Sequence, residues 1–118
     1  MSIKIASRGD VWLVNFDPTI GSEINKTRPA IVVNSDFLGI LDVHIMVPIT
    51  DWKDRYGKNL WHIKIINDDT NGLDKVSAVD VLQIRSVSIE RLTKKLGRVS
   101  STVMEEIVAA IAAVVEYQ

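Results

Sequence analysis

The sequence predicts a mainly β fold with helices (α+β class), in which a small, strongly bent sheet closes into a barrel and a C-terminal helix plugs it. Two patterns predict this fold. Short apolar or alternating segments recur up to Val99, as expected of several short strands, and the apolar spacing then changes to the helical period. A chain of 118 residues with 47% hydrophobic content is long enough for one core and too short for two ordinary domains. We therefore expect a single domain over residues 1–118.

Six strands are expected in chain order. The first, Val11 to Phe16, ends at the turn formers Asp17 and Pro18. The second, Ala30 to Asn34, is a continuous apolar run, which is typical of a strand covered on both faces. The other four are Asp42 to Ile49, Leu60 to Ile66, Ser77 to Ser86 and Leu96 to Val99.

The third and fourth of these segments alternate, so their faces can be assigned. Each has one apolar face and one face that carries a histidine, either His44 or His62. A histidine in this setting is more often a half-exposed strand residue than a base, and the two lack the spacing of a metal site. The apolar faces comprise Val43, Ile45 and Val47 in one segment and Trp61, Ile63 and Ile65 in the other.

The C-terminal segment predicts an amphipathic helix. Ser101 or Thr102 is the expected N-cap, and Glu105 stands three residues after Thr102 in the capping-box pattern. The apolar positions at helical spacing are Val103, Ile107, Ile111, Val114 and Val115.

Composition narrows the function classes. The chain has no cysteine, which excludes disulfides, thiolate chemistry and zinc–cysteine sites and suits a reducing cytoplasm. The segment Met1 to Arg8 lacks the apolar stretch of a secretory signal. The longest apolar run, Ile107 to Val115, falls short of the ~20 residues that span a bilayer. We expect a cytoplasmic protein with no membrane partner.

The formal net charge is −1, so any surface that binds nucleic acid must be local. Among the basic groups, we interpret Lys94 and Lys95 as part of a solvated face. The candidate groups are Lys26 with Arg28, Arg55 with Lys58, Arg85, and the cluster Arg91, Lys94, Lys95 and Arg98.

The loop between the first two strands carries the most informative chemistry. It holds one carboxylate, Glu23, and one guanidinium, Arg28, with Gly21 and Pro29 as turn signals on either side. A carboxylate and a guanidinium are what a phosphodiester-cleaving site needs. The alternative is a weak, exposed ion pair, which is the commoner role for such residues.

Several short pieces of the chain, taken in order and spacing, resemble the MazF/PemK family of toxin endoribonucleases. No piece is specific alone, but together they extend over nearly the whole chain. They are Gly9-Asp10-Val11-Trp12, Asp17-Pro18-Thr19, Gly21-Ser22-Glu23, Lys26-Thr27-Arg28-Pro29, Val47-Pro48-Ile49-Thr50, Gly72-Leu73, Gln83-Ile84-Arg85 and Leu96-Gly97. The resemblance implies an SH3-like barrel.

The resemblance also implies a catalytic set of Glu23, Arg28 and Thr50. Glu23 is the expected general base for a 2′-hydroxyl. Arg28 is expected to stabilise the charge that develops at phosphorus and to be the partner on the side where the leaving oxygen takes up a proton. Thr50 is the expected phosphate anchor, although a hydroxyl at the end of a strand more often caps a turn. No metal or other cofactor is expected.

Other side chains are candidates for RNA binding. Trp52 lies in a polar loop where it can stack on a base, whereas Trp12 and Trp61 are expected in the core. Gln83 and Arg85 share a strand face by alternation, and they can order the loop, bind phosphate or serve the structure alone. The set is Lys26, Thr27, Trp52, Arg55, Gln83 and Arg85, with Ser77 as a further recurring polar position and Asp68 and Asp69 as turn residues.

The predicted function is that of a toxin of a type II toxin–antitoxin system: a metal-independent, sequence-specific endoribonuclease that cleaves single-stranded RNA. By resemblance its partners are a second copy of the chain and a cognate antitoxin whose disordered tail folds into the RNA groove. Two alternatives are a non-catalytic barrel that binds antitoxin or RNA, and a gyrase poison of the same fold. The ending Val115-Glu116-Tyr117-Gln118 argues against the gyrase poison, which ends in Trp-Gly-Ile. The sequence that is cut cannot be read from the residues.

Overall fold

The computed structural model of the chain describes residues 4–117. Outside the described residues lie Met1 to Ile3 and Gln118. These four residues belong to the domain predicted over residues 1–118. The strands are β1 (Asp10–Asn15), β2 (Thr27–Val32), β3 (Val43–Asp51), β4 (His62–Ile65), β5 (Ser77–Asp80), β6 (Arg85–Ser88) and β7 (Leu92–Arg98). The helix α1 (Ser101–Val114) follows them, and short 3-10 helices are η1 (Asp36–Leu38), η2 (Asp54–Lys58), η3 (Val81–Gln83) and η4 (Ile89–Arg91).

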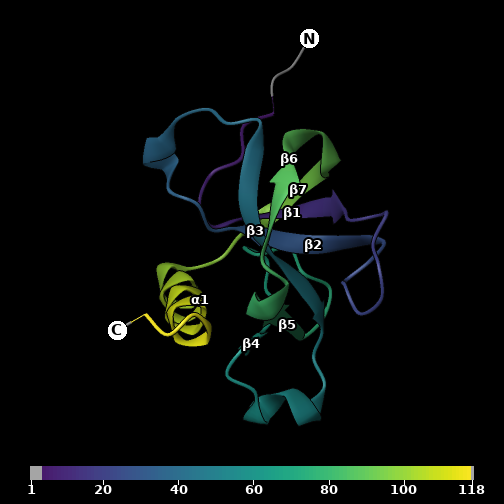
Figure 1. The fold of residues 1–118 in the computed structure, drawn as a ribbon, viewed down its shortest axis with the longest axis vertical. Coiled ribbons are helices and arrows are strands. Elements are labelled where there is room, and N and C mark those ends of the chain that lie inside the picture. The colour runs from purple at the N-terminus through teal and green to yellow at the C-terminus, as the bar shows by residue number, and fades with distance from the viewer. Residues whose placement is uncertain (1–3, 118) are drawn as a thin grey trace.

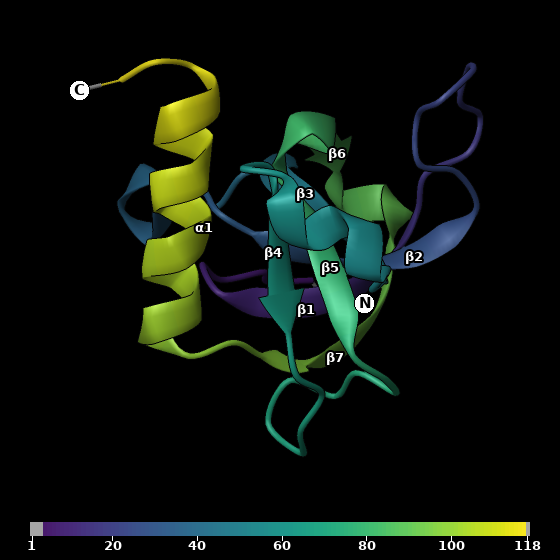
Figure 2. The ribbon, with the colours of Figure 1, turned by 90° about the horizontal axis from the view of Figure 1, so that it is seen from below.

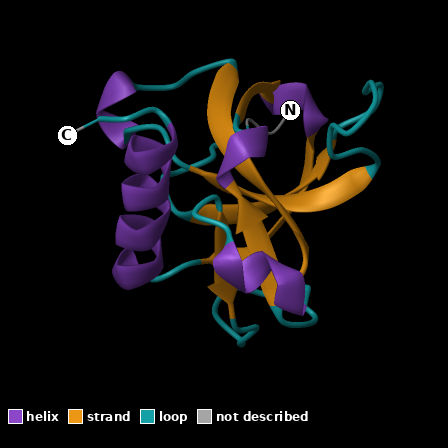
Figure 3. Ribbon diagram, turned by 60° about the horizontal axis from the view of Figure 1, so that its bottom comes forward, coloured by secondary structure: helices purple, strands orange, loops and turns teal. Residues whose placement is uncertain are grey.

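The strands form one antiparallel sheet in the order β4-β5-β3-β2-β1-β7, with β6 paired to β3 (Figure 1). The mainly β class with a C-terminal helix is confirmed. The closure of the sheet differs from the expectation, because within residues 4–117 the two edge strands β4 and β7 are not paired with each other. The sheet is strongly bent but open, and α1 packs beside β4 and η3 (Figure 3).

Both faces of the bent sheet are covered by apolar side chains. One cluster includes Ile31, Val47 and, from α1, Ile107; the other includes Phe16 and Val32. Because Ile31 and Val32 are neighbours in β2 that point to opposite faces, β2 is buried on both sides, as its continuous apolar run predicts.

The alternation predicted for the first half of β3 is present, but the half-exposed position expected of His44 is wrong. Val43 and Ile45 are 49% and 44% exposed, whereas His44 is 5% exposed. His44 is not half-exposed because Asn34 provides a polar partner: Asn34 Oδ1 lies 3.3 Å from Nδ1 of His44 and accepts a hydrogen bond from the Ile45 amide at 3.0 Å. Burial lowers the pKa of His44, against the opposing charges of Asp36 and Asp10.

The predicted fifth strand, 77–86, is divided in two. The Asp80 side chain accepts a hydrogen bond from the Leu82 amide at 3.1 Å and begins η3, which redirects the chain. As a result β5 pairs with the end of β3 and β6 with its beginning. The expected sixth strand is also longer, since β7 begins at Leu92.

The helix begins one residue earlier than expected. Ser100 is the N-cap, because its Oγ accepts a hydrogen bond from the Val103 amide at 3.2 Å, so neither Ser101 nor Thr102 has that role. The buried positions of α1 are Met104, Ile107 and Ala110, while Val115 follows the helix and is 68% exposed.

The helix and the β1–β2 loop lie on opposite sides of the sheet. Figures 1 and 2 both place α1 at one side of the molecule and the loop that follows β1 at the other. Among the described residues there is no helix that is both long and apolar enough to cross a membrane.

Candidate active site

The loop between β1 and β2 is closed at its base by backbone and side-chain hydrogen bonds. The Phe16 amide donates to the Lys26 carbonyl at 2.9 Å, and the Lys26 amide donates to Asp17 Oδ1 at 3.0 Å. The guanidinium of Arg91 donates to the carbonyls of Asn15 and Asp17 at 3.0 and 2.6 Å. These contacts hold the loop as an extension of β1 and β2.

Glu23 caps the turn at the tip of this loop. Its Oε1 accepts a hydrogen bond from the Ile20 amide at 2.7 Å, and its own amide donates to the Ile20 carbonyl at 3.2 Å. The side chain is exposed.

Gln83 connects the loop tip to the rest of the fold. Its Nε2 donates to the Ser22 carbonyl at 3.1 Å, and its Oε1 accepts from the Ile24 amide at 3.2 Å. Gln83 is the last residue of η3, whereas Arg85 opens β6, so the two do not share a strand face as alternation predicted. Of the roles considered for Gln83, ordering the loop is the one that these contacts serve.

Arg28 and Thr50 come from neighbouring strands and line the same cavity, of about 440 Å³. Both side chains are half-buried. Arg28 lies in β2, and its Nε donates to the Asn25 carbonyl at 3.2 Å, which leaves the other nitrogen atoms of the guanidinium for a ligand. Thr50 lies near the end of β3, where it pairs with Ala78 of β5.

The same cavity has walls that the sequence did not indicate. Asp51 and Lys75 line it and form an ion pair of 3.1 Å between Oδ2 and Nζ. Lys94, which we interpreted as part of a solvated face, is exposed but also lines this cavity. Apart from the recurring polar position Ser77, which is buried at the cavity wall, no motif in the sequence marks these residues.

Glu23 opens onto a second cavity, of about 390 Å³. Gln83 and Arg85 line this cavity too, and the Arg85 guanidinium carbon lies 5.7 Å from the ring centroid of Phe16. The structure therefore brings Arg28 and Thr50 to one cavity and leaves Glu23 in a separate hollow. Both cavities are lined by β3, one by Ile49 and Thr50 and the other by Pro48.

Trp52 begins an aromatic cluster next to Thr50. Trp52 is half-buried, and the Tyr56 ring meets it edge-on at a centroid distance of 6.0 Å. The Nζ atom of Lys64 lies 5.2 Å from the centroid of the Trp52 ring. Arg55 lies over Tyr56, with its guanidinium carbon 5.2 Å from that ring centroid. Lys64 thus takes one approach to the Trp52 ring that a base would use.

His62 is stacked within the same cluster. Its ring lies 3.8 Å from that of Tyr56, and its Nε2 is 3.6 Å from Oδ2 of Asp80. The residue is half-buried, as expected of a strand histidine, although its side chain is only 7% exposed because the stacking ring and the polar partners cover it. Burial lowers the pKa of His62, opposed by Asp80 and assisted by the charge of Arg55.

The remaining candidates lie on the surface. Lys26 and Thr27 are exposed at the start of β2, beside Arg28. Asp68 is a turn residue as predicted, because its Oδ1 accepts hydrogen bonds from the amides of Thr70 and Asn71 at 2.9 and 2.7 Å. Within residues 4–117, no group of three or more His, Cys, Asp or Glu side chains is placed to hold a metal ion.

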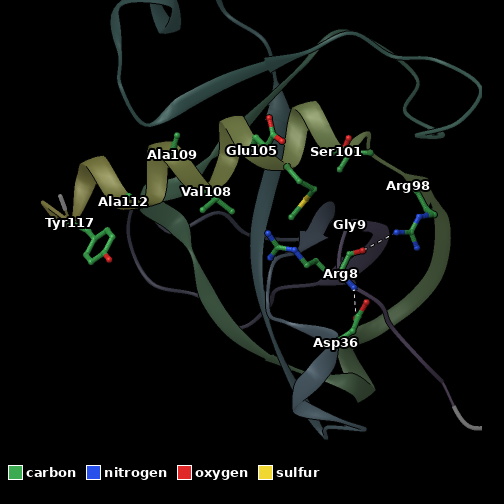
Figure 4. Close-up of a pocket in the computed structure, with 12 residues that line it drawn as sticks. Arg8, Gly9, Asp36, Arg98, Ser101, Glu105, Val108, Ala109, Ala112 and Tyr117 are labelled. Carbon is green, nitrogen blue, oxygen red and sulfur yellow. Dashed lines mark hydrogen bonds between the residues drawn. The ribbon is translucent and has the colours of Figure 1, made fainter.

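A further cavity, of about 740 Å³, lies elsewhere. It runs along α1 past Val108 and Ala112 to Tyr117, with Arg8 and Asp36 on its other wall (Figure 4). It shares no lining residue with the hollows that hold Glu23, Arg28 and Thr50.

Comparison with known proteins gives consistent results. Residues 7–115 match the family described as PemK-like, MazF-like toxin of type II toxin–antitoxin system. The chain is 32% identical over 110 residues to endoribonuclease MazF9 of Mycobacterium tuberculosis, covering 88% of this chain and 91% of that protein. It is 30% identical over 111 residues to endoribonuclease PemK of Escherichia coli, covering 91% and 80% respectively.

Solved structures share the fold. A crystal structure of MazF from Deinococcus radiodurans superposes with a TM-score of 0.79 at 19% identity and covers 97% of this chain and 99% of that one. A mycobacterial endoribonuclease in complex with its cognate antitoxin superposes with a TM-score of 0.74 at 16% identity, covering 97% and 98%.

Proposed function

The chain belongs to the PemK-like, MazF-like toxins of type II toxin–antitoxin systems, and on that basis we propose that it is an endoribonuclease that cleaves single-stranded RNA. The observation that carries the proposal is the cavity shared by Arg28 and Thr50. A guanidinium fork and a hydroxyl on one wall can hold the non-bridging oxygens of a phosphodiester. We further propose that residues 1–118 form one domain and that it acts in the cytoplasm without a metal ion.

Glu23 is the base in this proposal. It abstracts the proton of a ribose 2′-hydroxyl, whose oxygen then attacks phosphorus as the bond to the 5′-oxygen breaks. The products are a 2′,3′-cyclic phosphate, which water can open to a 3′-phosphate, and a 5′-hydroxyl formed when the leaving oxygen takes up a proton. Support comes from the two cavities that β3 lines: in this proposal the ribose occupies the hollow of Glu23 and the phosphate that of Arg28 and Thr50.

Arg28 stabilises the charge that develops on the phosphate oxygens, and Thr50 donates a hydrogen bond to one of them. Lys26 and Thr27, exposed beside Arg28, would contact the flanking backbone, together with Arg55 and the ring of Trp52. Arg85, at the mouth of the Glu23 cavity, is placed for a similar contact.

The partners in this proposal are a cognate antitoxin and a second copy of the chain. The antitoxin follows from the family and from the mycobacterial relative that was solved with its own antitoxin. The second copy is supported by the groove along α1, where Val108 and Tyr117 are 41% and 79% exposed beside Ala112. Val43 and Ile45 of β3 add exposed apolar surface.

One experiment tests the proposed reaction. The protein is incubated in chelator with a long RNA, and with oligonucleotides that carry a single ribonucleotide, or none, at the mapped cut site. We expect discrete cleavage of the RNA and of the one-ribonucleotide oligomer, with 5′-hydroxyl ends, whereas all-deoxy and 2′-O-methyl oligomers stay intact. Loss of activity in chelator, 5′-phosphate ends, or cleavage of the all-deoxy oligomer would refute the mechanism.

A further inference from the structure

We infer that Gln83 is a positioning residue for Glu23: its side-chain amide fixes the backbone on both sides of that carboxylate and acts on cleavage through the loop, without touching RNA. The inference rests on the endoribonuclease activity proposed above. Its basis is the pair of hydrogen bonds to Ser22 and Ile24, which are 61 and 59 residues away in sequence.

The chemistry of the amide suits this role. The Ile24 N–H can only donate and the Ser22 carbonyl can only accept, so the two contacts require one acceptor and one donor and fix the orientation of the amide. A glutamine side chain offers both at the right length. A glutamate of the same size offers acceptors only, and a methionine has no strong donor or acceptor.

The loop tip has little else to hold it. The hydrogen bonds of Ile20 with Glu23 are internal to the tip, and the contacts of Asp17, Lys26 and Arg91 lie at the base of the loop. Within residues 4–117, the two bonds from Gln83 are the only hydrogen bonds between residues 20–24 and another element.

The two hydrogen bonds from Gln83 to Ser22 and Ile24, which we call the clamp, also connect the loop of Glu23 to the strands that hold Thr50. Ala78 of β5 pairs with Thr50 of β3, and η3 follows directly on β5 to end at Gln83. Gln83 therefore fixes the base-bearing loop relative to the phosphate-binding strand. Each polar atom of its amide makes one of these two bonds, so the amide is held in one orientation by the loop.

The test combines kinetics with amide exchange. In Gln83→Met, which is similar in size, we expect kcat to fall about 10- to 100-fold, the scale of a small misplacement of a catalytic group. The affinity for an uncleavable all-deoxy oligomer should not change, and the Ile24 amide should exchange its hydrogen faster. Gln83→Glu keeps the acceptor for Ile24 but lacks the donor for Ser22, so its kcat should fall less than that of Gln83→Met. Ser86→Ala, an exposed neighbour on β6, is the matched control and should behave as the wild type.

A double variant decides whether Gln83 acts through Glu23. If it does, Gln83→Met adds no further loss in a Glu23→Gln background, because the group being positioned is already gone. The inference is overturned if the rate losses of Gln83→Met and Glu23→Gln multiply in the double variant. It is also overturned if Gln83→Met binds the uncleavable oligomer more weakly, or if exchange at the Ile24 amide is unchanged. If the wild-type protein cleaves no RNA, the proposed function falls, while exchange at Ile24 still tests the clamp by itself.

Discussion

Gly72 and Gly97 lie back to back where the loop after β4 crosses β7. A Cβ atom on Gly72 would lie 2.1 Å from the carbonyl oxygen of Leu96, and one on Gly97 would lie 2.1 Å from that of Thr70. The Arg98 amide donates to the same Thr70 carbonyl at 2.9 Å, which holds the crossing together. The backbones can approach this closely only because neither residue has a side chain.

We therefore predict that Gly97→Ala destabilises the fold by about 1–3 kcal/mol or more, because a backbone must shift to admit the methyl group. Gly72→Ala should cost more, since φ at Gly72 is also positive, at 69°. The matched control is Gly57→Ala, whose nearest neighbour is a Trp52 ring atom at 3.9 Å. Denaturant unfolding measures all three, and equal stability of Gly97→Ala and Gly57→Ala would contradict the prediction.

The second prediction separates catalysis from folding at Arg28. Arg28→Ala should lower the cleavage rate at least ~100-fold, the effect of removing one transition-state donor. Its Tm should change little, because within residues 4–117 the Arg28 side chain donates only to the carbonyl of Asn25, in its own loop. Arg28→Lys should recover little activity, since a point charge does not replace the planar fork. Kinetics and thermal melting check this; an unfolded Arg28→Ala variant would make Arg28 a structural residue.

The third prediction concerns the buried histidines. Burial holds the pKa of His44 and of His62 below the ordinary value of about 6.5, so the unfolded chain takes up protons that the folded chain does not. Stability should therefore be complete above about pH 6.5 and fall as the pH decreases from there toward the folded-state pKa values.

Unfolding free energies at several pH values, with NMR titration of the ring protons, measure this effect. His62→Gln should weaken the pH dependence below about pH 6.5, because one of the two titrating groups is removed. A ring that titrates above its ordinary range in the folded protein would contradict the assigned environment.

The fourth prediction concerns assembly. We expect a homodimer of about twice the 13.2 kDa chain mass, and Val108→Glu should convert it to monomer by placing charge in the groove along α1. Leu60→Glu is the control, because Leu60 is also an exposed apolar residue, at 72%, and does not line that groove. Sedimentation at micromolar concentration measures the result. A fully active wild-type monomer would refute the dimer.

The sequence predicts those parts of the fold that depend on local pattern. The apolar run after Pro29 and the helical spacing after Ser100 are strong signals, since burial on two faces or on one stripe leaves little choice of element. The sequence signal for the end of β5 is weaker, because the strand ends where the Asp80 carboxylate caps a turn within an otherwise strand-like segment.

The arrangement of the site was only partly predictable. Glu23 and Arg28 are close in sequence, but the cavity that each one faces depends on tertiary contacts, above all on the Gln83 amide. The burial of His62 likewise depends on Tyr56 and Asp80, which come from separate elements. No spacing rule in a single sequence relates residues that meet only after the sheet has formed.

The pairing of β1 with β7 has a consequence for synthesis of the protein. The first strand to leave the ribosome has its outer neighbour among the last, since Asp10 pairs with Arg98 and Leu13 with Lys94. Lys94 also lines the cavity of Arg28. A nascent chain that stops short of β7 thus has neither a complete sheet nor a complete cavity, so the cavity of Arg28 is complete only after synthesis has passed β7.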